Sequence, residues 1–161
     1  MNKYLIGALA GLVALAAVVA GCGSSSDSTS STATLSKAEF VKQGNAICKE
    51  GNESINAEFE EFSKENNLSE TKAPPKAVQE EAVEEILIPA INGQIEEVKA
   101  LGTPEGDEGE LEEVVTAEEE VVEEAEEAPI SLLKGETGKQ KEANKLAREY
   151  GLTVCGEEES E

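Results

Sequence analysis

The stretch SKAEFVKQGNAICKEGNESINAEFEEF, residues 36–62, decides the fold of this chain. Ser36 is followed three residues later by Glu39, which is the spacing of a capping box at the start of a helix. In a capping box each of the two side chains accepts a hydrogen bond from the backbone N–H of the other residue. Leu35 precedes the cap and is placed to pack on Phe40 as a hydrophobic staple. These four residues predict that a helix begins directly after Ser36.

Apolar and small residues then recur at steps of three and four, which is the period of one helical face. They are Phe40, Gly44, Ile47, Cys48, Gly51, Ile55, Phe59 and Phe62. The pattern predicts one long helix with a buried face, ending near Asn66 before the turn-rich stretch Ala73-Pro74-Pro75. It also predicts that Cys48 points inward.

Three further segments carry a helical pattern, at 75–101, 105–127 and 137–150. The segment 105–127 has mostly Glu outside one apolar face, and that face consists of Leu111, Val114, Val115, Val121, Val122 and Ala125. Together with the first helix, these segments predict an all-α fold. The expected architecture is an antiparallel, up-and-down bundle of about four helices, tied by one disulfide and spanning residues 35–156.

Two short features qualify this pattern. Pro89 lies inside the segment 75–101, where it removes one backbone hydrogen bond and crowds the preceding turn, so the sequence predicts that this helix is kinked or split in two. Leu152-Thr153-Val154 carries a strand-like signal after the last helix. Gly151, just before it, is placed to cap that helix.

The N-terminal region has the layout of a secretory signal. Lys3 is followed by 20 uncharged residues, from Tyr4 to Gly23. The alternative is an uncleaved membrane anchor, since 20 residues of helix reach about 30 Å, enough to cross the hydrocarbon core. In both cases the rest of the chain is expected outside the cytoplasm.

The end of this apolar run, Val18-Val19-Ala20-Gly21-Cys22, resembles the lipobox of bacterial lipoprotein precursors. The resemblance implies that residues 1–21 are a signal peptide, that the thiol of Cys22 is lipidated, and that Cys22 becomes the first residue of the mature chain. Residues 22–34 then form a lipidated Cys followed by a Ser/Thr-rich tether, which carries too little apolar surface to fold. We expect residues 157–161 to be a disordered acidic tail.

Lipidation of Cys22 would leave two cysteines, Cys48 and Cys155, in an oxidising compartment. We therefore predict a disulfide between them that closes most of the mature chain into one loop. The alternative is two separate buried thiols that behave as small apolar residues.

Composition excludes several function classes. The chain has no His, so Ser-His-Asp and Cys-His nucleophile pairs and imidazole metal sites are excluded. It has 35 acidic and 13 basic residues and a formal net charge of -22, which disfavours nucleic acid as a partner. We predict no catalytic residue, no cofactor and no metal ligand.

The segment between Ala100 and Leu133 holds 13 acidic residues and no basic one. The simplest interpretation is a solvated helical face, and the alternative is diffuse binding of Ca²⁺, Mg²⁺ or a basic partner. Glu118 is the one acid in line with the apolar face of its helix. Such a residue is usually an edge position, and the alternative is that it faces a functional cavity.

Several motifs resemble small actinobacterial-type lipoproteins of unassigned function. Besides the lipobox and the tether, they are Phe-Val-x-Gln-x-Asn-Ala-Ile-Cys at residues 40–48, Leu87-x-Pro89-Ala90, Leu101-Gly102-x-Pro104 and Tyr150-Gly151-Leu152-x-x-Cys155-Gly156. The resemblance covers nearly the whole mature domain. It implies a helical fold tied by a disulfide and no catalytic residue.

These observations predict a lipid-anchored protein on the extracytoplasmic face of the cell membrane. Its expected function is non-enzymatic, as a binding or scaffolding module with an unknown protein or cell-envelope partner. The alternative function is binding of a small ligand or a divalent cation, in a cavity between helices or on the acidic third helix.

Overall fold

The computed structural model describes residues 34–69, 71–134 and 138–156. The predictions for the signal peptide, for Cys22, for the tether up to residue 33 and for the tail at 157–161 lie outside these residues. The described chain is mostly helical and contains no strand. No helix in it combines the length and the apolar composition needed to span a bilayer.

The first helix, α1 (Lys37–Glu65), begins and ends where the sequence predicts. The capping box is present: Ser36 Oγ accepts from the N–H of Glu39 at 3.3 Å, and the N–H of Ser36 donates to Glu39 Oε2 at 3.1 Å. Asn66 is the C-cap, and Asn67 follows it with a φ of 51°. The eight residues of the predicted face are all buried or half-buried.

The segment predicted at 75–101 forms three consecutive helical pieces, α2 (Lys76–Ala82), η1 (Val83–Leu87) and α3 (Ile88–Ala100). Helical structure continues through Pro89 without a gap, so the split, one of the two predicted alternatives, does not occur. The middle piece is a π-helical turn, in which the N–H of Ile88 donates to the carbonyl of Val83, five residues back. Pro89 has no N–H to donate to Glu85 and its ring crowds that carbonyl, and the wider π turn just before it accommodates both effects.

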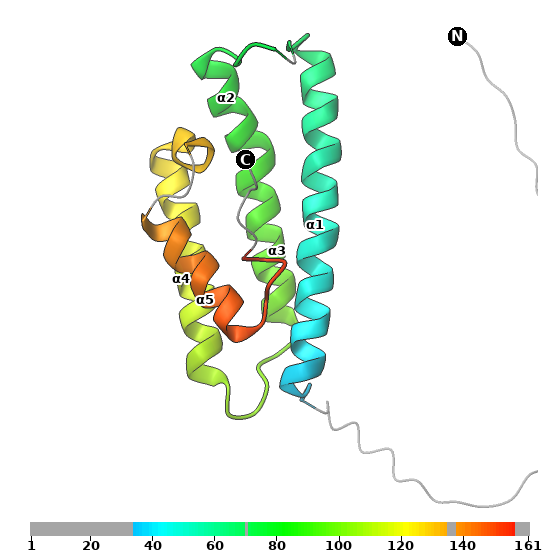
Figure 1. Cartoon of the computed structure of the whole chain (residues 1–161), viewed down its shortest axis with the longest axis vertical. Coiled ribbons are helices and arrows are strands. Elements are labelled where there is room, and N and C mark those ends of the chain that lie inside the picture. The colour runs from blue at the N-terminus through cyan, green and yellow to red at the C-terminus, as the bar shows by residue number, and fades with distance from the viewer. Residues whose placement is uncertain (1–33, 70, 135–137, 157–161) are drawn as a thin grey trace, which may run out of the picture. The chain divides into compact units, whose positions relative to one another are not determined.

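The remaining elements are α4 (Glu108–Glu127), the 3₁₀ turn η2 (Pro129–Leu133) and α5 (Gly138–Tyr150). In the order of the chain, α1 packs along α3, α3 along α4, and α4 along α5 (Figure 1). The main core lies among these helices and is formed by Phe40, Val98, Leu111, Val114, Ala147, Tyr150 and Leu152. A second core joins the end of α1 to α2 and η1 and contains Phe62, Ala82 and Ile86.

Tyr150 ties the end of α5 to the start of α1. Its ring meets that of Phe40 edge to face, with the centroids 5.8 Å apart, and Lys37 Nζ lies 4.3 Å from its centroid. The same ammonium forms ion pairs with Glu110 at 2.8 Å and Asp107 at 3.4 Å. Burial, and next the charge of Asp107, raise the pKa of Tyr150 to about 12.

The strand-like signal at 152–154 is wrong, because these residues form turns after α5. Gly151 caps the helix with a φ of 113°, a conformation that favours glycine, and Leu152 turns back into the main core. The backbone groups that a strand would pair are held by Asn45 of α1. Its side chain accepts from the N–H of Val154 at 2.8 Å and donates to the carbonyl of Gly151 at 2.9 Å.

The predicted disulfide is confirmed. Cys48 of α1 is bonded to Cys155, with the Cα atoms 5.1 Å apart and a sequence separation of 107. The bond lies beside the hydrogen bonds of Asn45, so the end of the domain is attached to α1 both covalently and by side-chain contacts.

The close packing of the C-terminal turn on α1 leads to a first prediction. A Cβ at Gly44 would lie 2.5 Å from Cδ2 of Leu152, so the side chain of Leu152, which is only 2% exposed and belongs to the main core, would have to shift. Gly44→Ala should therefore lower the free energy of unfolding by about 1–2 kcal/mol, despite the helical preference of Ala. Urea unfolding of the full chain measures the change.

Gly93→Ala is the matched control, because Gly93 is also helical and a Cβ there would meet nothing within 4 Å. We expect this variant to gain about 0.5–1 kcal/mol from helix propensity alone. Equal stabilisation by both substitutions would show that the contact between Gly44 and Leu152 is not tight.

Candidate functional site

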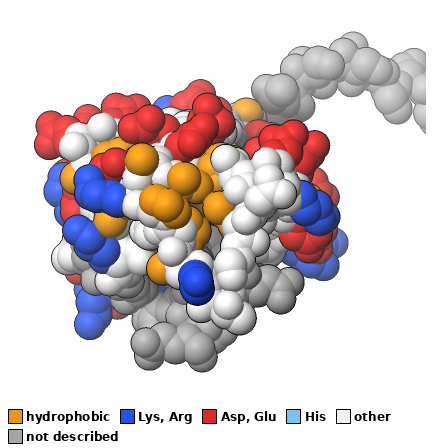
Figure 2. Space-filling model, turned by 90° about the horizontal axis from the view of Figure 1, so that it is seen from above, with side chains coloured by type: hydrophobic (Ala, Val, Ile, Leu, Met, Phe, Trp, Pro, Cys, Tyr) orange, Lys and Arg blue, Asp and Glu red, His pale blue; other side chains and the backbone are white. Residues whose placement is uncertain are grey.

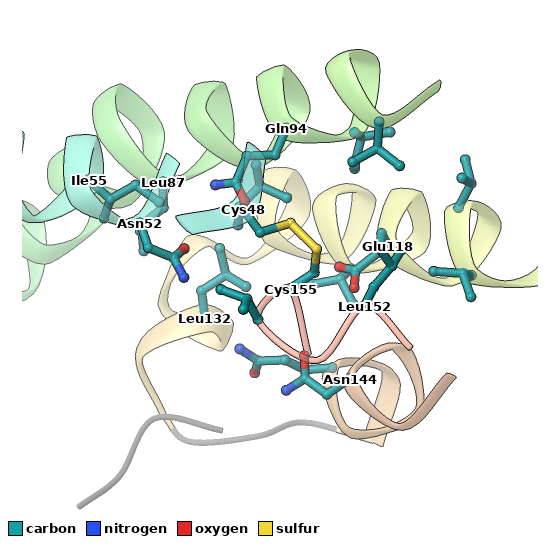
Figure 3. A pocket seen from close by; sticks show the side chains of 18 of the residues that line it. Cys48, Asn52, Ile55, Leu87, Gln94, Glu118, Leu132, Asn144, Leu152 and Cys155 are labelled. Atoms are coloured by element: carbon teal, nitrogen blue, oxygen red, sulfur yellow. A yellow bond between two sulfur atoms is a disulfide. The ribbon is translucent and has the colours of Figure 1, made fainter. Parts of the chain in front are cut away.

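A cavity of about 530 Å³ lies between the helices and reaches the disulfide (Figure 3). Side chains from α1, η1, α3, α4, η2, α5 and the C-terminal turn line it. Its apolar wall consists of Ile55, Leu87, Ile91, Ile95, Val98, Val114, Val115, Val121, Leu132, Leu152 and Val154. A volume of this size is in the range of small-molecule sites in proteins.

The polar part of the lining consists of five amide side chains and one carboxylate. The amides are Asn52, Asn56, Gln94, Gln140 and Asn144, and the carboxylate is Glu118. Asn52, Gln94 and Asn144 come from three different helices and lie around the cavity in Figure 3. Amide groups both donate and accept hydrogen bonds, so they suit many polar ligands and orient few of them strictly.

Glu118 reaches the cavity because of its position on α4. Val114 and Val121 lie four residues before it and three residues after it, and all three line the cavity. At the helical period these residues share one face. Figure 3 shows the carboxylate of Glu118 directed inward, toward the side of the cavity where the disulfide lies, and not out to solvent.

The environment of Glu118 is unfavourable for a charged group. Its Oε1 atom is buried and has no hydrogen-bond partner among the described residues. Burial raises the pKa of this carboxyl from 4.5 to about 7. No Lys or Arg is among the described residues that line the cavity, so no protein cation compensates the charge. A raised pKa in a cavity is a common property of functional carboxylates.

The structure thus places Glu118 in the lining of the cavity. Cys48 and Cys155 also line it, a placement that the sequence prediction of their bond did not include. The π turn contributes Leu87 to the lining. Such turns are rare in helices and occur often at functional sites.

The other acids of α4 have a different role. Glu119 pairs with Lys99 at 3.2 Å, and Glu120 lies 3.9 Å from Lys139 of α5. In the part of the chain that the structure describes, no three carboxylate or thiol side chains come together as a metal-binding group. Glu119 and Glu120 therefore form exposed ion pairs between helices.

A second hollow of about 310 Å³ lies between the end of α1, the following loop, α2 and η2. Phe59, Phe62, Leu68, Val78 and the 41% exposed Leu133 contribute to its apolar lining. It contains no ionisable side chain among the described residues, so nothing in it defines the chemistry of a ligand.

Comparison of the chain with protein-family models, with curated proteins and with solved structures finds no match. The resemblance to small lipoproteins therefore stays a prediction from motifs. The functional argument depends on the cavity and on Glu118.

Proposed function

We propose that this protein is a lipid-anchored, extracytoplasmic binding domain that holds a small molecule in the cavity around Glu118. The observation that carries the proposal is the buried Oε1 of Glu118, which has no hydrogen-bond partner among the described residues of a preformed cavity. This function corresponds to the small-ligand alternative from the sequence.

The energetic cost of Glu118 supports a ligand. A half-buried carboxylate with one buried, unpartnered oxygen destabilises a fold, while an apolar residue at position 118 would continue the valine face of α4. A ligand that donates a hydrogen bond to Oε1 would offset that cost when it binds. The cavity is already open in the structure, so binding needs no large rearrangement.

A binding function fits the lining better than catalysis does. Acid–base chemistry on sugars needs two carboxylates whose pKa values are separated. Glu118 is the one carboxylate among the described lining residues. We therefore keep the expectation that the protein is not an enzyme.

The cellular setting of this proposal comes from the sequence. A signal peptide at residues 1–21, lipid on Cys22 and the tether would place the domain just outside the cell membrane. The packing of α1 on α3, α3 on α4 and α4 on α5 supports the antiparallel, up-and-down arrangement that we infer for the helices. A protein or cell-envelope partner for a scaffolding role stays a prediction, and nucleic acid is not expected.

The proposal is tested with 1-octanol, a neutral probe with an apolar chain and one hydrogen-bond donor. The full chain in detergent should be stabilised by about 1.4 kcal/mol at a probe concentration ten times Kd. Val115→Phe fills part of the cavity and should weaken binding at least tenfold. Native mass spectrometry and thermal unfolding measure the bound fraction and the stabilisation.

Val41→Phe is the control of identical size change, because Val41 packs on the main core without lining the cavity. It should keep the octanol affinity of the original chain. Part of the octanol dissolves in detergent micelles, so all three proteins are compared in the same detergent, where this loss is equal. Equal octanol binding by all three proteins would contradict the proposed function.

A further inference from the structure

We infer that the ligand is an amphipathic organic cation, with an apolar body that fills the cavity and a protonated amine that pairs with the carboxylate of Glu118. The inference rests on the proposed function and assigns the class of molecule that the cavity accepts. It follows from the distribution of charge and apolar surface around the cavity.

The charge balance of the lining selects a cation. Glu118 belongs to α4, and the described lining residues from α1, η1, α3, η2, α5 and the C-terminal turn are apolar side chains, amides and the disulfide. An ionised Glu118 therefore gives the cavity one net negative charge, with no Lys or Arg among the described lining residues to neutralise it. A neutral ligand would leave this charge uncompensated, and an anion would add a second charge of the same sign.

The shape of the lining selects an organic cation over a metal ion. Ca²⁺ requires six to eight oxygen ligands and Mg²⁺ an octahedral set, usually with more than one carboxylate. The cavity offers one carboxylate beside an apolar wall formed by residues such as Ile91, Ile95 and Val98. An ammonium group donates hydrogen bonds and pairs with a single carboxylate, and its apolar body would be buried against this wall.

The surface of the molecule also favours a cation. The chain has a formal net charge of -22. Figure 2, which looks along the long axis, shows acidic side chains mainly along the upper and right edge of that face, Lys and Arg side chains at its left and right, and a group of hydrophobic side chains near its centre. A field of this sign raises the local concentration of organic cations and lowers that of anions.

The test compares 1-aminooctane with 1-octanol, which have the same chain and differ in charge. At pH 8 the amine is protonated and Glu118 is mostly ionised, so the full chain should bind the amine roughly tenfold or more tightly than the alcohol. At pH 5 Glu118 is mostly neutral, and the ratio of the two affinities should fall to about one. Calorimetry of the detergent-purified protein measures both affinities.

Glu118→Gln should give a ratio of about one at both pH values, because the amide has nearly the shape of the carboxyl group and carries no charge. Glu123→Gln is the matched control on the same helix, at an exposed position outside the cavity, and should keep the preference for the amine at pH 8. The Val115→Phe variant should bind both probes more weakly.

The outcomes separate this inference from the proposed function. In one outcome, Val115→Phe abolishes octanol binding, but the original chain binds both probes equally at pH 8 or prefers the alcohol. This result would overturn the inference that the ligand is a cation and would leave the cavity as a binding site. An amine preference that survives Glu118→Gln would assign it to surface charge and would overturn the inference too. If neither probe binds, or if Val115→Phe leaves the binding of both probes unchanged, both proposals are overturned.

Discussion

Removal of the disulfide is expected to lower the free energy of unfolding of the full chain by about 3–5 kcal/mol, the range that loop closure of this length supports. Cys48 and Cys155 are 107 positions apart, so the bond constrains most of the unfolded domain. For a loop of about 100 residues the chain-entropy value is about 4.7 kcal/mol, an upper figure because unfolded chains retain some structure. A double Cys48→Ala, Cys155→Ala variant measured by urea unfolding gives the difference.

Reduction provides the control for this experiment. A reducing agent should destabilise the original chain by nearly the same amount and should leave the double variant unchanged. The loss should also weaken binding of octanol, because both cysteines line the cavity. A double variant within about 1 kcal/mol of the original chain would show that contacts such as those of Asn45 hold the C-terminal turn without the bond.

Replacing Glu118 by Gln is expected to stabilise the ligand-free protein at pH 8 by up to about 3 kcal/mol. This value follows from the rise of the carboxyl pKa from 4.5 to about 7, since each pKa unit corresponds to about 1.4 kcal/mol. Gln keeps the size of the side chain and removes the cost of burying its charge. Urea unfolding of both proteins between pH 4 and pH 8 measures the difference.

The direction of the pH dependence follows from the raised pKa. Between pH 4.5 and about 7 the folded chain holds the proton of Glu118 more tightly than the unfolded chain does. The contribution of this group to stability is therefore complete below pH 4.5 and is lost as pH rises through about 7. The advantage of Gln should be close to zero at pH 4 and should grow to its full value by pH 8.

The matched control for this prediction is again Glu123→Gln, which removes the same charge from an exposed position of α4. Its effect should be small at every pH, and it corrects for the general repulsion among the acidic residues of this chain. Equal pH profiles for the two variants would show that Glu118 is hydrated in solution and would contradict its burial.

Local sequence signals were sufficient to predict most of the fold. The capping box of Ser36 and Glu39 and the cap at Gly151 place helix ends, because the groups that satisfy these ends lie within a few residues of them. The pairing of Cys48 with Cys155 followed from counting, because the predicted lipidation of Cys22 would leave these two cysteines as partners. Tertiary packing was not needed for these predictions.

The features that were missed depend on contacts between distant segments. The position of Glu118 in line with valines is visible in the sequence, but its burial requires α5 and the C-terminal turn to approach α4. The π turn before Pro89 was not predicted, since the choice between a break and a wider turn depends on what the following helix packs against. The same dependence explains why Val154 bonds to Asn45 and does not form a strand.

The first helix and the C-terminal turn of the domain meet at the cavity. The cavity wall therefore depends on residues near both ends of the domain. Leu152, Val154 and Cys155 are among the last described residues, yet they form part of the cavity wall against α1. A chain shortened before residue 152 would lose this part of the wall and the bond between Cys48 and Cys155. Under the proposed function, a chain shortened before residue 152 should therefore bind octanol more weakly than the full chain, because it lacks part of the cavity wall.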